Sequence, residues 1–160
     1  LLTIHASGFT PTDAGLIPTG EILPVEGTPL DFRTPHAIGE RIGRTDYEPL
    51  AFGNGYDHNW ALDKPEAGTV SLAAEAYEPA TGIRMKIYTD QPGLQFYAGQ
   101  GMDGKEVGKR GDRHNFRSGI ALETQNFPDA PNHDNFPSSV LRPGETYTQH
   151  TVYAFETDEQ

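Results

Sequence analysis

Three stretches of the sequence combine acids, amides, imidazoles and aromatic rings closely enough to form a polar binding site. Residues 55–60 read GYDHNW, residues 92–97 read PGLQFY, and the third stretch joins Glu123 and Gln125 to the loop residues 133–135, which read HDN. Aromatic faces cover the C–H surfaces of a sugar ring, while carboxylates and amides bond its hydroxyl groups. This mixture of residue types therefore suits a sugar.

Glu123 stands out because it lies in an apolar, strand-like run, residues 120–124, directly before a long loop rich in Pro and Asn. Burying a carboxylate without a partner is costly, and apolar surroundings raise the pKa of a carboxyl group toward the range of a general base. An outward-facing glutamate on a half-exposed strand would give the same pattern. Both interpretations stay open at this level.

The other candidates also have structural interpretations. Asp57 could cap a turn, and Gln95 could bond the neighbouring backbone inside a sheet. His58 and His133 could bind a metal ion with nearby aspartates, but their spacing matches no tight ligand motif, so we expect no metal site. A Ser–His–Asp nucleophile system lacks an elbow motif to support it.

The composition narrows the class of protein. The 160 residues fit one domain, and 18 Gly and 13 Pro with 35% apolar residues are typical of many short strands joined by turns. A formal net charge of −11 argues against nucleic acid or an anionic membrane surface as a partner. The absence of cysteine excludes a disulfide scaffold and a thiol nucleophile, and no apolar run is long enough to span a membrane.

The elements that must position these residues are predicted to be strands. Alternation is best in residues 69–77, 82–89, 94–98 and 147–155, and weaker in residues 1–6, 22–25, 30–33 and 120–124. Turn residues dominate 7–21, a Gly-rich turn leads from residue 47 into an aromatic strand, residues 99–118 are predicted to be a surface loop, and residues 37–42 stay open between helix and strand. No run shows a sustained helical period, so the sequence predicts an all-β, antiparallel sandwich.

Four longer motifs occur in order between about residue 9 and residue 155: FTPTDAGLIPTGEILPVEGTPLDFR, GYDHNWAL, TDQPGLQFYAG and ALETQNFPDAPNHDNFPSSVLRPGETY. In these motifs the chain resembles the aldose 1-epimerase (galactose mutarotase) family. The resemblance implies a large antiparallel β-sandwich, the galactose mutarotase-like supersandwich. It also implies interconversion of the α and β anomers of free aldoses such as galactose or glucose, without a metal or organic cofactor. It assigns Glu123 as the general base, Asp57 to sugar hydroxyls and Gln95 to a further polar contact.

The chain also departs from the family pattern. The family's general acid is a histidine in a motif like H-x-Y-F-N, and no such motif occurs in these 160 residues. Residues 98–100 read AGQ where the family usually reads TGN. We therefore expect residues 1–160 to be the C-terminal portion of a single domain, and a second chain to carry the absent N-terminal half. We expect a cytoplasmic protein, with a periplasmic or secreted one left open.

Two other functions remain open at the level of the sequence. One is a non-catalytic carbohydrate-binding sandwich that keeps the polar site but lacks the acid. The other is an epimerase-like enzyme of phosphorylated hexoses, which needs a basic pocket. The candidates for that pocket share one charged loop, for which a solvated surface loop is the favoured explanation: Lys105, Lys109, Arg110 and Arg113.

Overall fold

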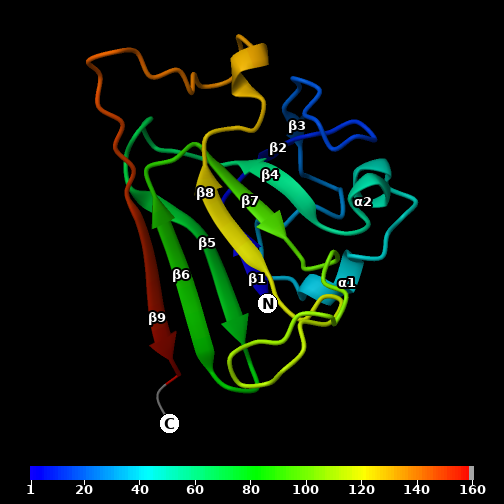
Figure 1. Ribbon diagram of the computed structural model, residues 1–160. Coiled ribbons are helices and arrows are strands. Elements are labelled where there is room, and N and C mark those ends of the chain that lie inside the picture. The colour runs from blue at the N-terminus through cyan, green and yellow to red at the C-terminus, as the bar shows by residue number, and fades with distance from the viewer. Residues whose placement is uncertain (159–160) are drawn as a thin grey trace.

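The computed structural model describes residues 1–158 and shows two antiparallel sheets packed as a sandwich (Figure 1). Within those residues one sheet has the strand order β1-β5-β6-β9 and the other β3-β2-β4-β7-β8. The elements are β1 (Leu2–Ile4), β2 (Gly8–Thr10), β3 (Leu23–Pro24), α1 (Ile38–Arg41), α2 (Glu48–Gly53), β4 (Asp57–Ala61), β5 (Ser71–Glu78), β6 (Ile83–Thr89), β7 (Gly93–Tyr97), β8 (Ala121–Gln125), the 3-10 helix η1 (Ala130–Asn132) and β9 (Thr151–Thr157). The all-β sandwich predicted from the sequence is confirmed, with two short α-helices and one 3-10 helix added in the described residues.

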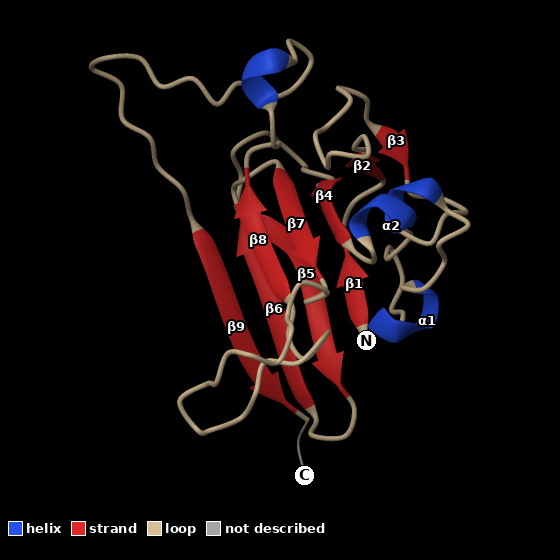
Figure 2. Ribbon diagram, turned by 45° about the vertical axis from the view of Figure 1, so that its right-hand side comes forward, coloured by secondary structure: helices blue, strands red, loops and turns tan. Residues whose placement is uncertain are grey.

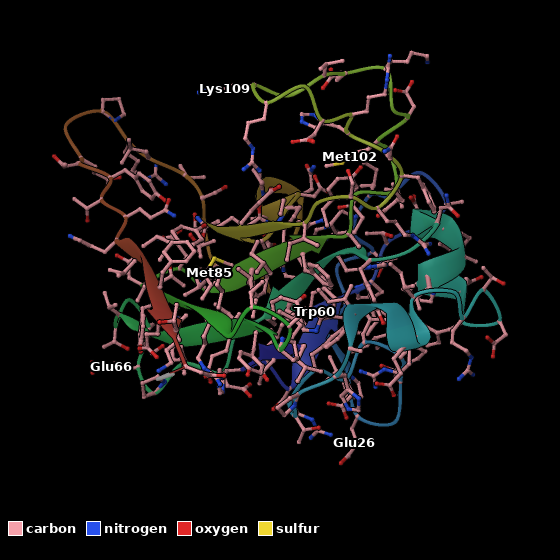
Figure 3. The ribbon with its side chains drawn as sticks, turned by 90° about the horizontal axis from the view of Figure 1, so that it is seen from below. Glu26, Trp60, Glu66, Met85, Met102 and Lys109 are labelled. Atoms are coloured by element: carbon pink, nitrogen blue, oxygen red, sulfur yellow. The ribbon has the colours of Figure 1, made fainter. Side chains whose placement is uncertain are left out.

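The core lies between the two sheets and beneath the loop that follows β3. Trp60 on β4 lies at its centre, fully buried, and Figure 3 shows its position in the middle of the molecule. The rings of Phe32, Tyr56 and Phe96 surround it at centroid distances of 6.0–6.4 Å. Its indole Nε1–H donates to the carbonyl of Leu30 at 3.1 Å, so the buried donor is paired.

Most of the predicted strands occur, with ends that shift by a few residues. The last predicted strand, 147–155, begins later and ends later in the structure, as β9. Residues 37–42, which the sequence left open, contain the short helix α1. The surface loop 99–118 is confirmed as a segment without a named strand or helix, and in Figure 3 Lys109 lies at its outer end.

Three local predictions are wrong. Residues 7–21 are not turns throughout, because they contain β2, which pairs with β4. Phe9 of β2 lies opposite Trp60 of β4 and is buried in the core, which holds this short strand against the sheet. Residues 30–33 form no strand, although Leu30 and Phe32 are fully buried, since both point into the core from a loop. The helix α2 was missed because its six residues are too few to show a helical period.

The strands β4, β7 and β8 lie side by side, with β7 antiparallel to its two neighbours (Figures 1 and 2). Loop 99–118 connects the lower end of β7 to β8. The segment with η1 follows the other end of β8. The three stretches that the sequence analysis singled out are thereby brought onto one sheet. No helix in the described residues is long and apolar enough to cross a membrane.

Candidate active site

The candidate residues meet because strand register aligns them. Asn59 on β4 pairs with Gln95 on β7, and Gln95 pairs with Glu123 on β8, which makes one row across three strands. Asp57 lies two residues before Asn59 and therefore on the same face of the sheet. Gln125 lies two residues after Glu123 by the same alternation. All three predicted site residues thus share one face.

A chain of side-chain hydrogen bonds joins this polar face. The amide nitrogen Nε2 of Gln95 donates to Oδ1 of Asp57 at 2.8 Å. Nε2 of Gln125 donates to Oε1 of Gln95 at 3.4 Å and to Oδ1 of Asn59 at 3.3 Å. Nδ2 of Asn59 donates to the Thr10 hydroxyl at 3.3 Å. Asp57 therefore does not cap a turn, and the Gln95 side chain bonds other side chains, not the neighbouring backbone.

The polar face forms the floor of an open cavity of about 510 Å³. Thr12, Leu16 and Pro18 line it from the loop after β2, and Pro128 lines it from the loop after β8. Asp57, Asn59, Gln95, Glu123 and Gln125 all contribute to the lining, together with Tyr97. This volume falls within the usual range for small-molecule sites.

Two loops that wall the cavity are tied to each other. Nε2–H of His133 donates to the Pro18 carbonyl at 3.3 Å and lies 3.2 Å from Oδ2 of Asp129. Nδ2 of Asn135 donates to the carbonyl of Gly20 at 2.9 Å. A methyl group at Gly20, whose φ is +90°, would collide with the His133 ring at 2.6 Å. The third sequence stretch thus contributes Glu123 and Gln125 to the floor of the cavity and His133 to its wall.

Glu123 is exposed and points out of the sandwich into the cavity, so of the two interpretations that the sequence left open the outward-facing one holds. The apolar neighbour Leu122 faces the core, because alternate residues of a strand point to opposite faces. The strand β8 is an edge of its sheet, and its outer carbonyls are bound by side chains. The Tyr153 hydroxyl donates to the carbonyl of Leu122 at 2.8 Å, and Gln149 Nε2 donates to that of Thr124 at 3.1 Å.

Neither histidine near the site is free to act as an acid. His58 is fully buried on the core face, where its ring packs edge-on against Phe9 and Trp60. Burial lowers the pKa of His58 to about 4, so the ring is neutral at pH 7. Its Nε2–H donates to the Pro49 carbonyl, and its Nδ1 accepts from the Asp57 backbone N–H, both at 3.1 Å. His133 is held by Pro18 and Asp129 in the loop wall.

Asn59, Thr10 and Tyr97 are lining residues to which the sequence gave no role. Asn59 was visible only as one amide in a polar cluster, and the strand alternation that starts at Asp57 would have placed it on the same face. Thr10 belongs to a stretch that the sequence analysis took as a turn. Tyr97 follows Gln95 by two residues, which is the signal that could have found it.

The charged loop does not form a phosphate pocket. Lys105 pairs with Asp103, Arg110 lies 3.8 Å from Asp112, and Arg113 donates to the carbonyl of Gly104 at 2.9 Å. Three of its four cations are therefore engaged within the loop itself. Among residues 1–158, no three His, Asp or Glu side chains gather in a group that could hold a metal ion.

Comparison with known proteins gives consistent matches over nearly the whole chain. The family model described as "Aldose 1-epimerase" matches residues 1–154. Galactose mutarotase from Rattus norvegicus is 42% identical over 154 residues, and aldose 1-epimerase from Escherichia coli (strain K12) is 35% identical over 157 residues. Each match covers 96% of this chain, but 43% and 44% of the relatives.

A solved structure shows the same fold. The GalM/aldose epimerase homologue from C. elegans superimposes with a TM-score of 0.84 and 31% sequence identity. The match covers 98% of this chain and 45% of that chain. The chain therefore spans less than half the length of the relatives it matches.

Proposed function

The chain belongs to the aldose 1-epimerase family, and we propose that its polar face is one side of an active site that interconverts the anomers of a free aldose. Galactose and glucose are the substrates that we expect. Glu123 is the general base, Asp57 binds sugar hydroxyl groups, and Gln95 makes a further polar contact. No metal or organic cofactor takes part in the proposed reaction.

The observation that carries this proposal is the placement of Glu123. Its carboxylate lies in one row with the amides of Gln95 and Asn59, at the edge of a cavity large enough for a monosaccharide. The floor of the cavity offers two carboxylates and three amides, which match the alternating donors and acceptors of sugar hydroxyls. A base beside such a surface can act on one bound hydroxyl selectively.

The proposed chemistry moves two protons. The Glu123 carboxylate takes the proton from the C1 hydroxyl, the electrons of that O–H bond form the second bond of the C1 carbonyl, and the bond from C1 to the ring oxygen breaks with its electrons going to the ring oxygen. The ring oxygen then takes a proton from a general acid. After rotation about the C1–C2 bond the ring closes by the reverse transfers, so Glu123 returns the proton it took.

The acid in this scheme comes from outside the described residues. His58 is neutral and committed to the Pro49 carbonyl, and His133 is held in the loop wall. We propose that an N-terminal half of the same domain, on this polypeptide or on a second chain, supplies the histidine that the family resemblance implies. Exposed apolar side chains on the paired strands β6 and β9 support this proposal, because a further half of the domain could pack against them. Ile83 is 47% exposed and Phe155 is 69% exposed.

Polarimetry tests the assignment of the base. Freshly dissolved α-D-galactose is followed with the intact natural polypeptide and with its Glu123→Gln variant. We expect the variant to lose at least about 100-fold in turnover, since general base catalysis contributes on this scale. Its affinity for the sugar should change much less, because the amide keeps the size and polarity of the carboxyl group.

A matched control is Glu66→Gln, the same chemical change at an exposed glutamate outside the cavity. It should leave the rate unchanged. An acceleration that persists in Glu123→Gln would overturn the assignment of the base. If the wild-type protein, assayed together with the N-terminal half of the domain, binds galactose by calorimetry but never accelerates mutarotation, the chain is a carbohydrate-binding module and the enzymatic proposal fails.

A further inference from the structure

We propose that Gln125 is a positioning residue, which with Asn59 fixes the orientation of the Gln95 amide and so prepares Asp57 and Gln95 for the sugar. This inference rests on the proposed function and extends it to a residue that makes no chemical step itself. It is carried by three features of the described residues: a glycine in the middle of the sheet, a directed chain of hydrogen bonds, and the burial of the residue that anchors that chain.

The first feature is Gly93, which opens β7 between β4 and β8. Glycine is unfavourable inside a strand unless a neighbouring group needs its space. Here a methyl group at residue 93 would overlap Oδ1 of Asn59 and lie 3.0 Å from Phe127 Cδ1. The missing side chain lets Asn59 and Gln125, which belong to strands on opposite sides of β7, meet above it with Oδ1 and Nε2 3.3 Å apart.

The second feature is the direction of the hydrogen bonds. Gln125 Nε2 donates both to Asn59 Oδ1 and to Gln95 Oε1, so both of its N–H groups point at acceptors. Since the Gln95 oxygen is held by this bond, its Nε2 is the end that faces Asp57, at 2.8 Å from Oδ1. Turning the Gln95 amide over would bring its oxygen against the Asp57 carboxylate, which can only accept.

The third feature is the anchor at the far end. Asn59 is 2% exposed and Thr10 is 1% exposed, and Asn59 Nδ2 donates to the Thr10 hydroxyl at 3.3 Å. A buried amide with both ends paired has one favourable orientation. The orientation of the Asn59 amide therefore fixes that of the Gln125 amide. The Gln125 amide in turn fixes the Gln95 amide, which donates to Asp57. Gln125 is the link between the buried anchor and the residues proposed to touch the sugar.

Two substitutions of Gln125 test this in the intact natural polypeptide, with D-galactose affinity measured by calorimetry and turnover by polarimetry. Gln125→Met keeps the length of the side chain and removes the donors. We expect the Kd and KM for galactose to rise about tenfold, the equivalent of one lost hydrogen bond. Turnover at saturation should change less than about threefold, since Glu123 and the acid are untouched.

Gln125→Glu makes the test specific to orientation. At neutral pH the introduced carboxylate faces two amide oxygens and can donate to neither, so KM should rise more than in Gln125→Met. As the pH falls toward about 4.3, the usual pKa of a glutamate, the introduced group gains a proton that it can donate to Gln95. The ratio of variant to wild-type Kd should therefore fall with pH, which a loss of packing alone would not produce.

Gln149→Met is the matched control, because it removes the same donors from a glutamine that bonds Thr124 and Thr151 outside the cavity. It should leave the galactose Kd unchanged. An unchanged Kd in Gln125→Met, or a Kd ratio for Gln125→Glu that does not depend on pH, overturns the positioning role while the base assignment stands. A wild-type protein that neither binds nor turns over galactose overturns both proposals together.

Discussion

The two faces of the strands β4, β7 and β8 are built from alternate residues of the same segments, yet they differ in almost every physical property. On the inner face His58, Trp60 and Phe96 are fully buried and packed ring against ring. On the outer face Asp57, Gln95 and their neighbours form hydrogen bonds around an open cavity. A shift of one residue along the chain exchanges one environment for the other.

This difference implies a division of labour between neighbouring residues. Substitutions on the inner face should act on the free energy of unfolding, because they remove packing from the core. Substitutions on the outer face should act on sugar affinity or turnover with little effect on stability, because their side chains are partly solvated. Experiments on residues that lie next to each other in the sequence test this division.

The largest effect is expected from Trp60→Ala. It removes the central ring of the inner face and leaves the buried carbonyl of Leu30 without its donor. We expect the free energy of unfolding to fall by about 3–5 kcal/mol, the range for deleting a buried aromatic side chain. Urea unfolding followed by far-UV circular dichroism measures it.

Trp60→Phe loses the indole donor and the packing of the pyrrole ring but keeps a six-membered aromatic ring in the core. It should cost less than Trp60→Ala, about 1–3 kcal/mol, because the cavity is smaller while the buried carbonyl of Leu30 still lacks its donor. Glu123→Gln on the outer face is the counterpart and should stay within about 0.5 kcal/mol of the wild type. A stability loss in Glu123→Gln as large as that in Trp60→Phe would break the division between the faces.

The next effect concerns pH and His58. Its pKa is about 6.5 in the unfolded chain and is lowered to about 4 in the fold by burial. Between pH 6.5 and 4 the unfolded state therefore binds a proton at His58 that the folded state does not bind, so the free energy of unfolding decreases as the pH falls from 6.5 toward 4. The shift corresponds to about 3 kcal/mol over that window.

His58→Gln isolates this contribution, because the amide retains a donor for the Pro49 carbonyl and has no titrating group. The variant should be less stable than the wild type at pH 7, and this difference should shrink between pH 6.5 and 4. The other histidines, such as His133 beside Asp129 and His150 beside Asp90, are the same in both proteins, so they do not affect the comparison. Parallel stability curves for the two proteins would contradict the buried, neutral state of His58.

The sequence predicted those features of the two faces that depend on residues close together in the chain. The alternation of Leu94, Gln95 and Phe96 is contained in three consecutive residues, and it placed Gln95 on a strand correctly. The resemblance to the family in four ordered motifs, confirmed by the family match over residues 1–154, carried the fold class. The roles of Asp57, Gln95 and Glu123 stay predictions, although the structure brings all three to one cavity.

What the sequence did not predict depends on register between strands far apart in the chain. The meeting of Asn59 and Gln125 above Gly93 joins residues 66 positions apart, and no local pattern specifies it. The apolar run 120–124 left the exposure of Glu123 open, because the local sequence does not show that β8 is an edge strand with one side open to solvent. The short strand β2 was hidden among turn residues for a related reason, since its pairing with β4 defines it.

The smallest effect is expected from Tyr153→Phe, which acts at the edge where the two faces meet. Tyr153 lies on β9 in the other sheet, and its hydroxyl donates to the carbonyl of Leu122 on the free edge of β8. Removing one such hydrogen bond should lower the free energy of unfolding by about 0.5–1.5 kcal/mol. Turnover should fall by less than about threefold, because β8 stays paired with β7 and Glu123 keeps its place.

A different result at Tyr153 would revise the division itself. Burial is the larger cause that raises the pKa of the Tyr153 hydroxyl, and the negative charge of Glu123 raises this pKa further. The hydroxyl therefore interacts electrostatically with the proposed base. If Tyr153→Phe lost turnover more than tenfold with an unchanged free energy of unfolding, the hydroxyl would belong with the reacting groups. The boundary between the stabilising and the chemical face would then pass through β9, one strand beyond the sheet that carries the cavity.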